Sequence, residues 1–437
     1  MCKFGLKSNS MLFPFLIALL LDSLPQLYES EDPLIFTNHV FDENIKTVQL
    51  YRDGWNLSYP VIKLRSDEKL VLHFDLLGNK IENYYYTFIH CNKDWEKSDV
   101  YPANYMEGFP ENPLEDYNSS FNTTTNFIHY KLTFPNEKVQ FNLSGNYILL
   151  VFPLNEPDTP ILSQRFVITE DVVRINITPH RSRMTADLYT SQQIDFTVNF
   201  STLRINDPYR DVYAFILQNG RWNNAKKNLK PEFVSGNELK YSSLSDNNIF
   251  PGGNEFRYFD IRSVRYQSEY VKRIDFLISN YHVYLVPSEN REFKPYFYWQ
   301  DFNGKYYIAV QEERNPDTDA DYVYVYFTLP SKSVLEGGKM YVSGALNNWS
   351  YDKNNLMIYN PVDQTYECVM LLKQGWYNYE YLFKKDLVEN GVATRFEGSH
   401  FETENDYTVI IYHRNPHERY DRVIGVQTIN TLNRLTD

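Results

Sequence analysis

The stretch IDFTVNF, residues 194–200, has the pattern of a strand that buries one face. Apolar side chains occupy every second position, and polar side chains fill the positions between them. Because successive side chains of a strand point to opposite faces, this alternation puts the apolar set on one side of a sheet. The two sets are Ile194, Phe196, Val198 and Phe200 on one face, and Asp195, Thr197 and Asn199 on the other.

Short strand-like runs of this kind recur along the whole chain. Turn-forming clusters such as DLLGNK, FPGGNE and DFNGKY separate them, and almost no window has the 3.6-residue period of a helix. Many short strands with little helix predict an all-β fold of tandem immunoglobulin-like β-sandwich domains. The runs include VIKL (61–64), KLVLHFDLL (69–77), YYYTFIHC (84–91), FIHYKLTF (127–134) and NYILLVF (146–152).

The length of 437 residues leaves room for about three domains. In RFVITEDVVRINI (165–177), one strand runs almost directly into the next, which is typical of a boundary between two sandwiches. The polar run QEERNPDTDAD (311–321) has the composition of a linker. We therefore expect a first sandwich at 34–170, a second at 171–315 and a C-terminal one at 320–428.

The first 28 residues have the layout of a secretory signal peptide. Lys3 and Lys7 precede an apolar run at 11–21, although no clear pair of small residues marks a cleavage site. The apolar run is too short to span a bilayer. The sequence therefore predicts an exported protein with no membrane-spanning segment of its own.

Charge and motif content argue against several classes of function. The net charge is −13 and no long basic run is present, so nucleic acid is not an expected partner. No nucleophile elbow, phosphate loop, dinucleotide fingerprint or zinc-type Cys/His spacing occurs. In HCNKDW (90–95), His90 and Cys91 are neighbours on a strand and point to opposite faces, which disfavours a shared metal. We therefore predict no catalytic residue, no cofactor and no metal site.

The C-terminal part contains a possible sugar-binding module. MYVSGALNNWS (340–350) and YECVMLLKQGWYNYEYLF (366–383) resemble the glycogen-binding-type β-sandwich. In that family a Trp after an Asn pair stacks on sugar, and Trp349 matches it. Glu380, however, stands where the family has a Lys, and no Trp follows in 387–396. The resemblance makes Trp349 and Trp376 candidate carbohydrate-binding residues, and an exported carbohydrate-binding protein is the alternative function.

A second resemblance covers most of the chain, from about residue 34 to 430. Several long strings, found in the same order, are similar to the plug protein family of the Bacteroidota type IX secretion system. These strings are more specific together than any single motif above. They are IKTVQLYRDGWNLSYPVIKL (45–64), HCNKDWEKSDV (90–100), NYMEGFPENPLEDYNSSFNTTTNFIHYKLTFPN (104–136), SGNYILLVF (144–152), FPGGNEFRYFDIRSVR (250–265), DFNGKYYI (301–308) and HRNPHERYDRVIGVQTIN (413–430).

The plug-family resemblance implies a non-enzymatic protein in the periplasm, at the inner side of the outer membrane. Such a protein docks on an outer-membrane translocon barrel and closes its periplasmic opening. We expect loops 104–126 and 248–258 to carry the contact, with Tyr117, Phe121 and Phe127 as candidate partner-binding residues. An alternative reading is that the Asn/Ser/Thr-rich segment of the first loop only fixes a long connection between strands.

Overall fold

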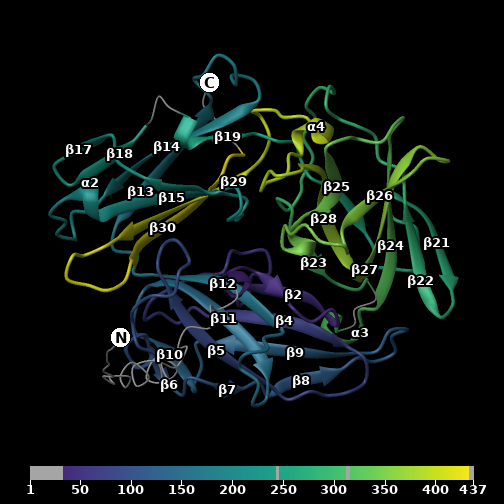
Figure 1. Ribbon diagram of the computed structural model, residues 1–437, viewed down its shortest axis with the longest axis horizontal. Coiled ribbons are helices and arrows are strands. Elements are labelled where there is room, and N and C mark those ends of the chain that lie inside the picture. The colour runs from purple at the N-terminus through teal and green to yellow at the C-terminus, as the bar shows by residue number, and fades with distance from the viewer. Residues whose placement is uncertain (1–32, 243–245, 312–314, 433–437) are drawn as a thin grey trace, which may run out of the picture. The chain divides into compact units, whose positions relative to one another are not determined.

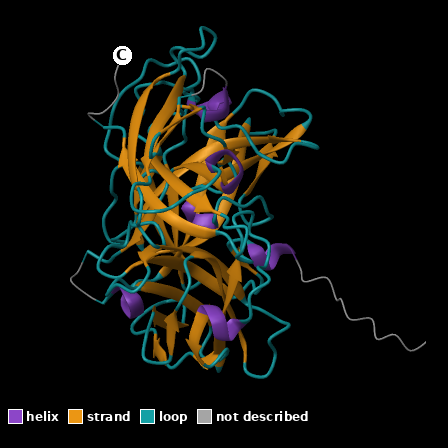
Figure 2. Cartoon of the chain, turned by 90° about the vertical axis from the view of Figure 1, so that its left-hand side faces the viewer, coloured by secondary structure: helices purple, strands orange, loops and turns teal. Residues whose placement is uncertain are grey.

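Strands make up nearly all the regular structure of the computed structural model, which describes residues 33–242, 246–311 and 315–432 (Figure 1, Figure 2). The expected signal segment, residues 1–28, lies outside the described residues. No helix in these described ranges is long and apolar enough to cross a membrane. The helices are α1 (Pro102–Tyr105), α2 (Pro208–Asp211), α3 (Pro316–Asp319) and α4 (Thr394–Glu397), with 3-10 turns at Pro33–Phe36, Asp246–Asn248 and Ala345–Asn347. The predicted all-β sandwich fold is confirmed.

The first sandwich consists of two main sheets around one apolar core. The larger sheet runs β1 (His39–Val40), β12 (Leu162–Thr169), β11 (Gly145–Pro153), β5 (Tyr84–Cys91) and β7 (Asn112–Pro113), with β3 (Val61–Lys63) paired to β12. The other runs β2 (Ile45–Arg52), β4 (Leu70–Leu77), β9 (Phe127–Phe134) and β8 (Asp116–Ser119). A short pair joins β6 (Met106–Gly108) to β10 (Val139–Phe141).

Strand β4 is covered on both faces. Leu72, Phe74 and Leu76 enter the core of the first sandwich. The alternate residues His73 and Asp75 are also buried, on the opposite face of the sheet. This second face is covered by the third sandwich, because Tyr322 Oη donates a hydrogen bond of 2.7 Å to Asp75 Oδ2.

The second sandwich is built from two stretches that are far apart in the sequence. One sheet runs β13 (Arg174–Arg181), β14 (Ser191–Asn199), β18 (Glu238–Tyr241) and β17 (Phe233–Ser235), with β19 (Ile249–Pro251) paired to β14. The other runs β16 (Lys226–Leu229), β15 (Val212–Gln218), β29 (Asp406–His413) and β30 (Arg422–Asn430). The apolar face predicted for 194–200 is confirmed, since its four residues are at most 5% exposed.

The third sandwich is one nine-stranded sheet folded around its own core. The sheet turns back on itself at strand β26, because the first residues of this strand pair with β25 and its last residues pair with β27. The order is β20 (Arg257–Asp260), β28 (Gly375–Lys385), β25 (Gly338–Ser343), β26 (Leu356–Asn360), β27 (Thr365–Lys373), β24 (Tyr322–Pro330), β22 (Asn280–Leu285) and β21 (Val271–Leu277), with β23 (Tyr306–Ile308) paired to β28.

The strand pairing divides the chain differently from the linear order expected from the sequence. Strands β20 to β23, which fall within the expected second domain at 171–315, belong to the third sandwich. Strand β29, which falls within the expected C-terminal domain at 320–428, pairs with β15 of the second sandwich, and β30 lies next to β29 in the same sheet (Figure 1). The reason is physical: alternation identifies the buried face of a strand, but it does not identify the neighbouring strand.

Candidate functional site

The three expected partner-binding residues have different surroundings. Phe121 is 72% exposed, and Tyr117 is 39% exposed with its ring 5.7 Å from that of Tyr130. Phe127 is only 1% exposed, and its ring packs edge-on against Tyr322 of the third sandwich. Tyr117 and Phe121 are therefore accessible to another protein, whereas Phe127 is part of an internal contact. The sequence could not separate them, because all three lie in or beside the same irregular segment.

The Asn/Ser/Thr-rich segment connects the first sandwich to the third. The carboxylate of Asp321 accepts hydrogen bonds from the backbone N–H groups of Thr124 (2.8 Å) and Thr125 (3.1 Å). The backbone N–H of Phe121 donates to the carbonyl of Thr318 at 3.0 Å. These bonds support the structural interpretation of this segment, and they leave the Phe121 side chain free to contact a partner.

The second expected contact loop, 248–258, is largely internal. Asn248, Phe250 and Glu255 are at most 3% exposed. Gly252 lies so close to the backbone of the 400 region that a Cβ atom there would be 1.9 Å from the carbonyl oxygen of His400. This loop is the connection between the second and third sandwiches, and it offers little surface for docking.

Buried carboxyl groups accompany that connection. Burial raises the pKa of Glu255 to about 7, although Oε1 accepts hydrogen bonds from Tyr296 Oη (2.5 Å) and the Glu404 N–H (3.0 Å). Burial, together with nearby Glu255, raises the pKa of Asp301 to about 8. Asp301 also accepts from the backbone N–H groups of Phe256 and Asn303. These carboxyl groups hold backbone segments together, and their charge depends on pH near neutrality.

The two candidate sugar-stacking residues have protein groups on their rings. The guanidinium of Arg221 lies 4.2 Å from the ring centroid of Trp349, and Phe256 contacts the same ring edge-on. Trp376 stacks on Tyr258 with 5.1 Å between ring centroids, and Arg262 lies 5.5 Å from its centroid. A sugar would have to displace these groups before it could stack. The structure therefore gives no support to carbohydrate binding through this pair.

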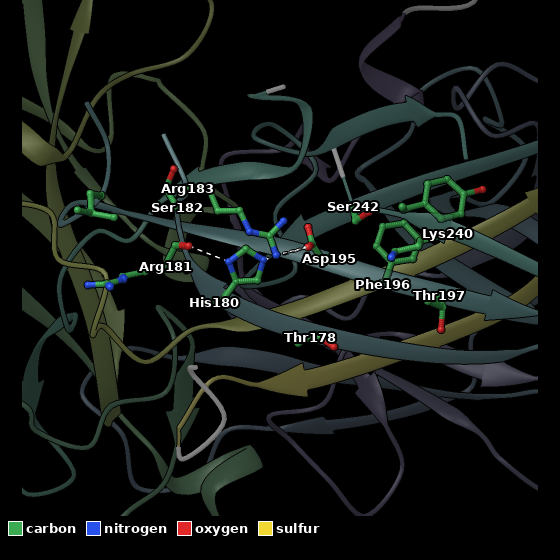
Figure 3. A pocket seen from close by; sticks show the side chains of 12 residues that line it. Thr178, His180, Arg181, Ser182, Arg183, Asp195, Phe196, Thr197, Lys240 and Ser242 are labelled. Carbon is green, nitrogen blue, oxygen red and sulfur yellow. Dashed lines mark hydrogen bonds and ion pairs between the residues drawn. The ribbon is translucent and has the colours of Figure 1, made fainter. Parts of the chain in front are cut away.

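A cavity of about 630 Å³ opens on the second sandwich (Figure 3). His180 and Asp195 lie in it with Nε2 and Oδ2 3.1 Å apart, and Arg183 lies 3.1 Å from the same carboxylate. The other ring nitrogen of His180 is 2.8 Å from the Arg181 carbonyl oxygen. Burial acts to raise the pKa of Asp195, but hydrogen bonds from His180 and Gln193 and the charge of Arg183 lower it overall. Both nitrogens of His180 thus face protein oxygens, an arrangement that suits a structural contact better than a general base.

Large apolar side chains that the sequence analysis did not name are also exposed, although one of them, Phe109, lies within the expected contact loop 104–126. In the first sandwich these are Tyr101 (75%) and Phe109 (76%). In the third they are Ile278 (95%) at the tip of the β21–β22 hairpin, and Phe293 (91%) and Phe297 (72%) between β22 and β23. The exposure of Phe293 and Phe297 could have been predicted from the sequence, because the aromatic residues around Pro295 do not alternate with polar residues as they would in a strand.

Comparison with known proteins gives a family for this architecture. Residues 45–170, which form most of the first sandwich, match the model for the type 9 secretion system plug protein 1st domain. The crystal structure of a hypothetical protein from Parabacteroides merdae is 36% identical in sequence, with a TM-score of 0.87. That match covers 90% of this chain and 99% of the other. No curated protein sequence matches the chain.

Two further solved structures are much more distant. The collagen adhesin of S. aureus is 8% identical, with a TM-score of 0.10 over 92% of this chain and 98% of that one. Dimeric latent PorU from Porphyromonas gingivalis is 11% identical, with a TM-score of 0.12 over 89% and 34%. Scores this low carry no structural argument. The family model and the P. merdae structure do, and this chain belongs to the type 9 secretion system plug protein family.

Proposed function

We propose that this protein is a non-enzymatic periplasmic plug that docks on the outer-membrane barrel of a type IX translocon and closes its periplasmic opening. The match of residues 45–170 to the first domain of the plug family is the observation that carries the proposal. A plug needs a fitting shape and a reversible contact, and it performs no chemical step. The polar groups around Glu255 and around His180 are bonded to other parts of the protein, which agrees with such a role.

Buried contacts at the junctions between sandwiches support a shape-based role. Tyr412 of the second sandwich donates a hydrogen bond of 2.8 Å to Asn146 of the first. Lys373 of the third forms an ion pair of 2.7 Å with Asp75 of the first, and both side chains are 1% exposed. A protein that is already ordered loses less conformational entropy when it docks, so more of the contact energy remains as affinity.

The first sandwich is the best candidate for the docking surface, because the family model matches it. Tyr101, Phe109 and Phe121 are each at least 72% exposed there, and exposed Glu107 and Glu111 lie beside Phe109. Aromatic anchors within a polar surround are typical of interfaces that form and dissociate. A stable contact of this kind buries roughly 1,600 Å² in total.

Co-purification with the barrel tests the proposal. The test uses point substitutions, because a deletion of the loop at 107–118 would also remove β7 and the buried side chain of Leu114. We compare the wild type with the triple variant Tyr101→Ser, Phe109→Ser and Phe121→Ser. Immobilised protein is exposed to detergent-solubilised outer membranes from the source organism, and the bound barrel is quantified.

The matched control replaces three exposed apolar residues of the third sandwich with serine: Val362, Leu387 and Val388. We expect the wild type and the control to retain the barrel, and the test variant to bind at least tenfold more weakly, a loss of about 1.4 kcal/mol. Retention of the barrel by the test variant at the wild-type level removes these residues from the interface. Failure of the wild type to retain the barrel at all overturns the plug proposal.

A further inference from the structure

Two histidines and one carboxylate converge where the first sandwich meets the third. His73 on β4 and His129 on β9 point from the same face of their sheet, and their nearest ring nitrogens, Nδ1 and Nε2, are 3.0 Å apart. Asp317 on α3 lies across from both, with its oxygens 4.0 Å from His73 Nδ1 and 3.7 Å from His129 Nε2. These three ligand atoms all lie within 4.8 Å of one another.

The spacing fits a tetrahedral metal. Nitrogen and carboxylate ligands bind Zn²⁺ at about 2.0–2.2 Å, which places two ligand atoms of a tetrahedron about 3.3 Å apart. The two ring nitrogens, 3.0 Å apart, are closer together than that value, and the contacts to Asp317, made by its two different oxygens at 3.7 and 4.0 Å, are longer. We propose that His73, His129 and Asp317 form a Zn²⁺ site that ties the first sandwich to the segment leading into the third, with the fourth position open to water.

An outer carboxylate holds one ligand in the orientation that such a site needs. Asp75 Oδ1 lies 2.6 Å from His129 Nδ1, so it accepts the hydrogen of that nitrogen and leaves Nε2 with a lone pair toward His73 and Asp317. A carboxylate behind a metal-binding histidine is the usual outer partner at zinc sites. Asp75 is itself held by Tyr322 and Lys373, both at 2.7 Å.

The charges around the site are compatible with a divalent cation. The Lys373 ammonium is a buried positive group beside the site, and the charge of Asp75 balances its charge in their ion pair. Lys131 stands opposite His73 in the strand register and is half-buried. Asp317 then remains as the negative charge that faces the ion directly. Its side chain is 40% exposed, which gives a metal a route from solvent to two largely buried imidazoles.

The chemistry of the ligands points to zinc before calcium or magnesium. Imidazole nitrogens suit Zn²⁺ and its transition-metal neighbours, whereas Ca²⁺ and Mg²⁺ take oxygen ligands. Without a metal, the same residues could form a hydrogen-bonded chain from Asp75 through His129 to His73. Asp317 distinguishes the two arrangements. It is a ligand in the zinc site, but it takes no part in the hydrogen-bonded chain, because its oxygens lie beyond hydrogen-bond distance of both rings.

Zinc titration of the purified chain, with any affinity tag removed and metal stripped by a chelator, separates these arrangements. Binding is measured by competition with a chromophoric chelator and by the zinc-dependent rise in melting temperature. The variants are Asp317→Asn and His129→Ala, with His282→Ala as control because His282 bonds Tyr326 away from the cluster. Asp317→Asn is the main test, since its exposed position lets it fold like the wild type.

We expect the wild type and His282→Ala to bind one equivalent of Zn²⁺ and to melt at a higher temperature with zinc than without. Both cluster variants should bind Zn²⁺ at least tenfold more weakly than the wild type, because loss of even a residue that only supports a metal ligand typically lowers metal affinity by about that factor. In chelator, Asp317→Asn should have the same melting temperature as the wild type. A wild type that takes up no stoichiometric zinc overturns the proposal, and so does an Asp317→Asn variant that binds as tightly as the wild type. Neither result bears on barrel docking, which is measured separately.

Discussion

Replacing Lys373 with methionine is the sharpest test of how the first and third sandwiches are held together. The ammonium of Lys373 lies 2.7 Å from Asp75 Oδ2 and donates to the carbonyl of Asp317 at 2.9 Å. Burial alone acts to raise the pKa of Asp75, but Lys373 and the hydrogen bond from His129 lower it overall. Asp75 therefore stays ionised in a site that excludes water, and the Lys373→Met variant would leave that charge without its counter-ion.

The expected cost follows from the burial of both partners. Removing one member of a buried ion pair typically costs about 3–5 kcal/mol, because the remaining charge has lost its compensation. Asp75 is 0% exposed and keeps its bonds to His129 and Tyr322, which reduce the cost but do not replace the positive charge. We therefore expect Lys373→Met to lower the free energy of unfolding by about 3 kcal/mol or more.

Urea unfolding at pH 7 in the presence of a chelator measures this loss, and the chelator removes any contribution from metal. The double variant Asp75→Asn with Lys373→Met should lose less stability than Lys373→Met alone, because it carries no buried charge. The exposed control Lys385→Met should change stability by less than about 0.5 kcal/mol. A loss below about 1 kcal/mol for Lys373→Met would refute the assignment of a strong buried ion pair, because solvent-exposed ion pairs contribute a stability of that size.

Three further predictions concern the remaining groups. Because the pKa values of Glu255 (about 7) and Asp301 (about 8) are raised, the folded protein holds protons that the unfolded chain releases near pH 4, so the free energy of unfolding should fall as pH rises from 6.5 to 8.5. Glu255→Gln should flatten this dependence in urea titrations, and an unchanged slope contradicts the assignment. Phe127→Ala should lower the free energy of unfolding by about 3–5 kcal/mol, whereas Phe121→Ala should change it by less than about 0.5 kcal/mol. Similar losses for the two variants would contradict the difference in burial between these side chains. Trp349→Ala should cost about 2 kcal/mol in thermal unfolding without changing retention on polysaccharide columns, and a specific loss of retention would restore the carbohydrate reading.

Individual strands could be predicted from the sequence, because strand alternation is a local property. The runs YYYTFIHC and FIHYKLTF coincide with β5 and β9, and KLVLHFDLL contains β4. The neighbours of each strand could not be predicted in this way. Strand β15 pairs with β29, almost two hundred residues later, and nothing in either strand identifies the other as its partner.

The buried polar cluster escaped sequence analysis for a related reason. Metal sites are recognised from sequence when their ligands are closely spaced, and here His73, His129 and Asp317 come from three separate elements. A weaker signal was present in VLHFDL, where a histidine and an aspartate interrupt a strand that is otherwise apolar on both faces. Polar residues at such positions need partners, because burying them unpaired is costly. The polar run 311–321, interpreted as a linker, brings the Asp317 carboxylate to 4.0 Å from the ring of His73.

Chain topology adds a constraint on how a plug of this architecture can work. The third sandwich is inserted into the second, because the chain leaves the second after β19 and returns to it at β29. The two connecting segments are bonded to each other: Asn254 Nδ2 donates to the Glu397 carbonyl at 2.7 Å, and Thr403 Oγ1 donates to the Gly253 carbonyl at 2.9 Å. Two bonded connections resist hinge motion more than a single linker does, and the Asp75–Lys373 pair braces the third sandwich against the first. Bending between sandwiches is then costly, so in the proposed function the translocon opens when the whole plug leaves the barrel.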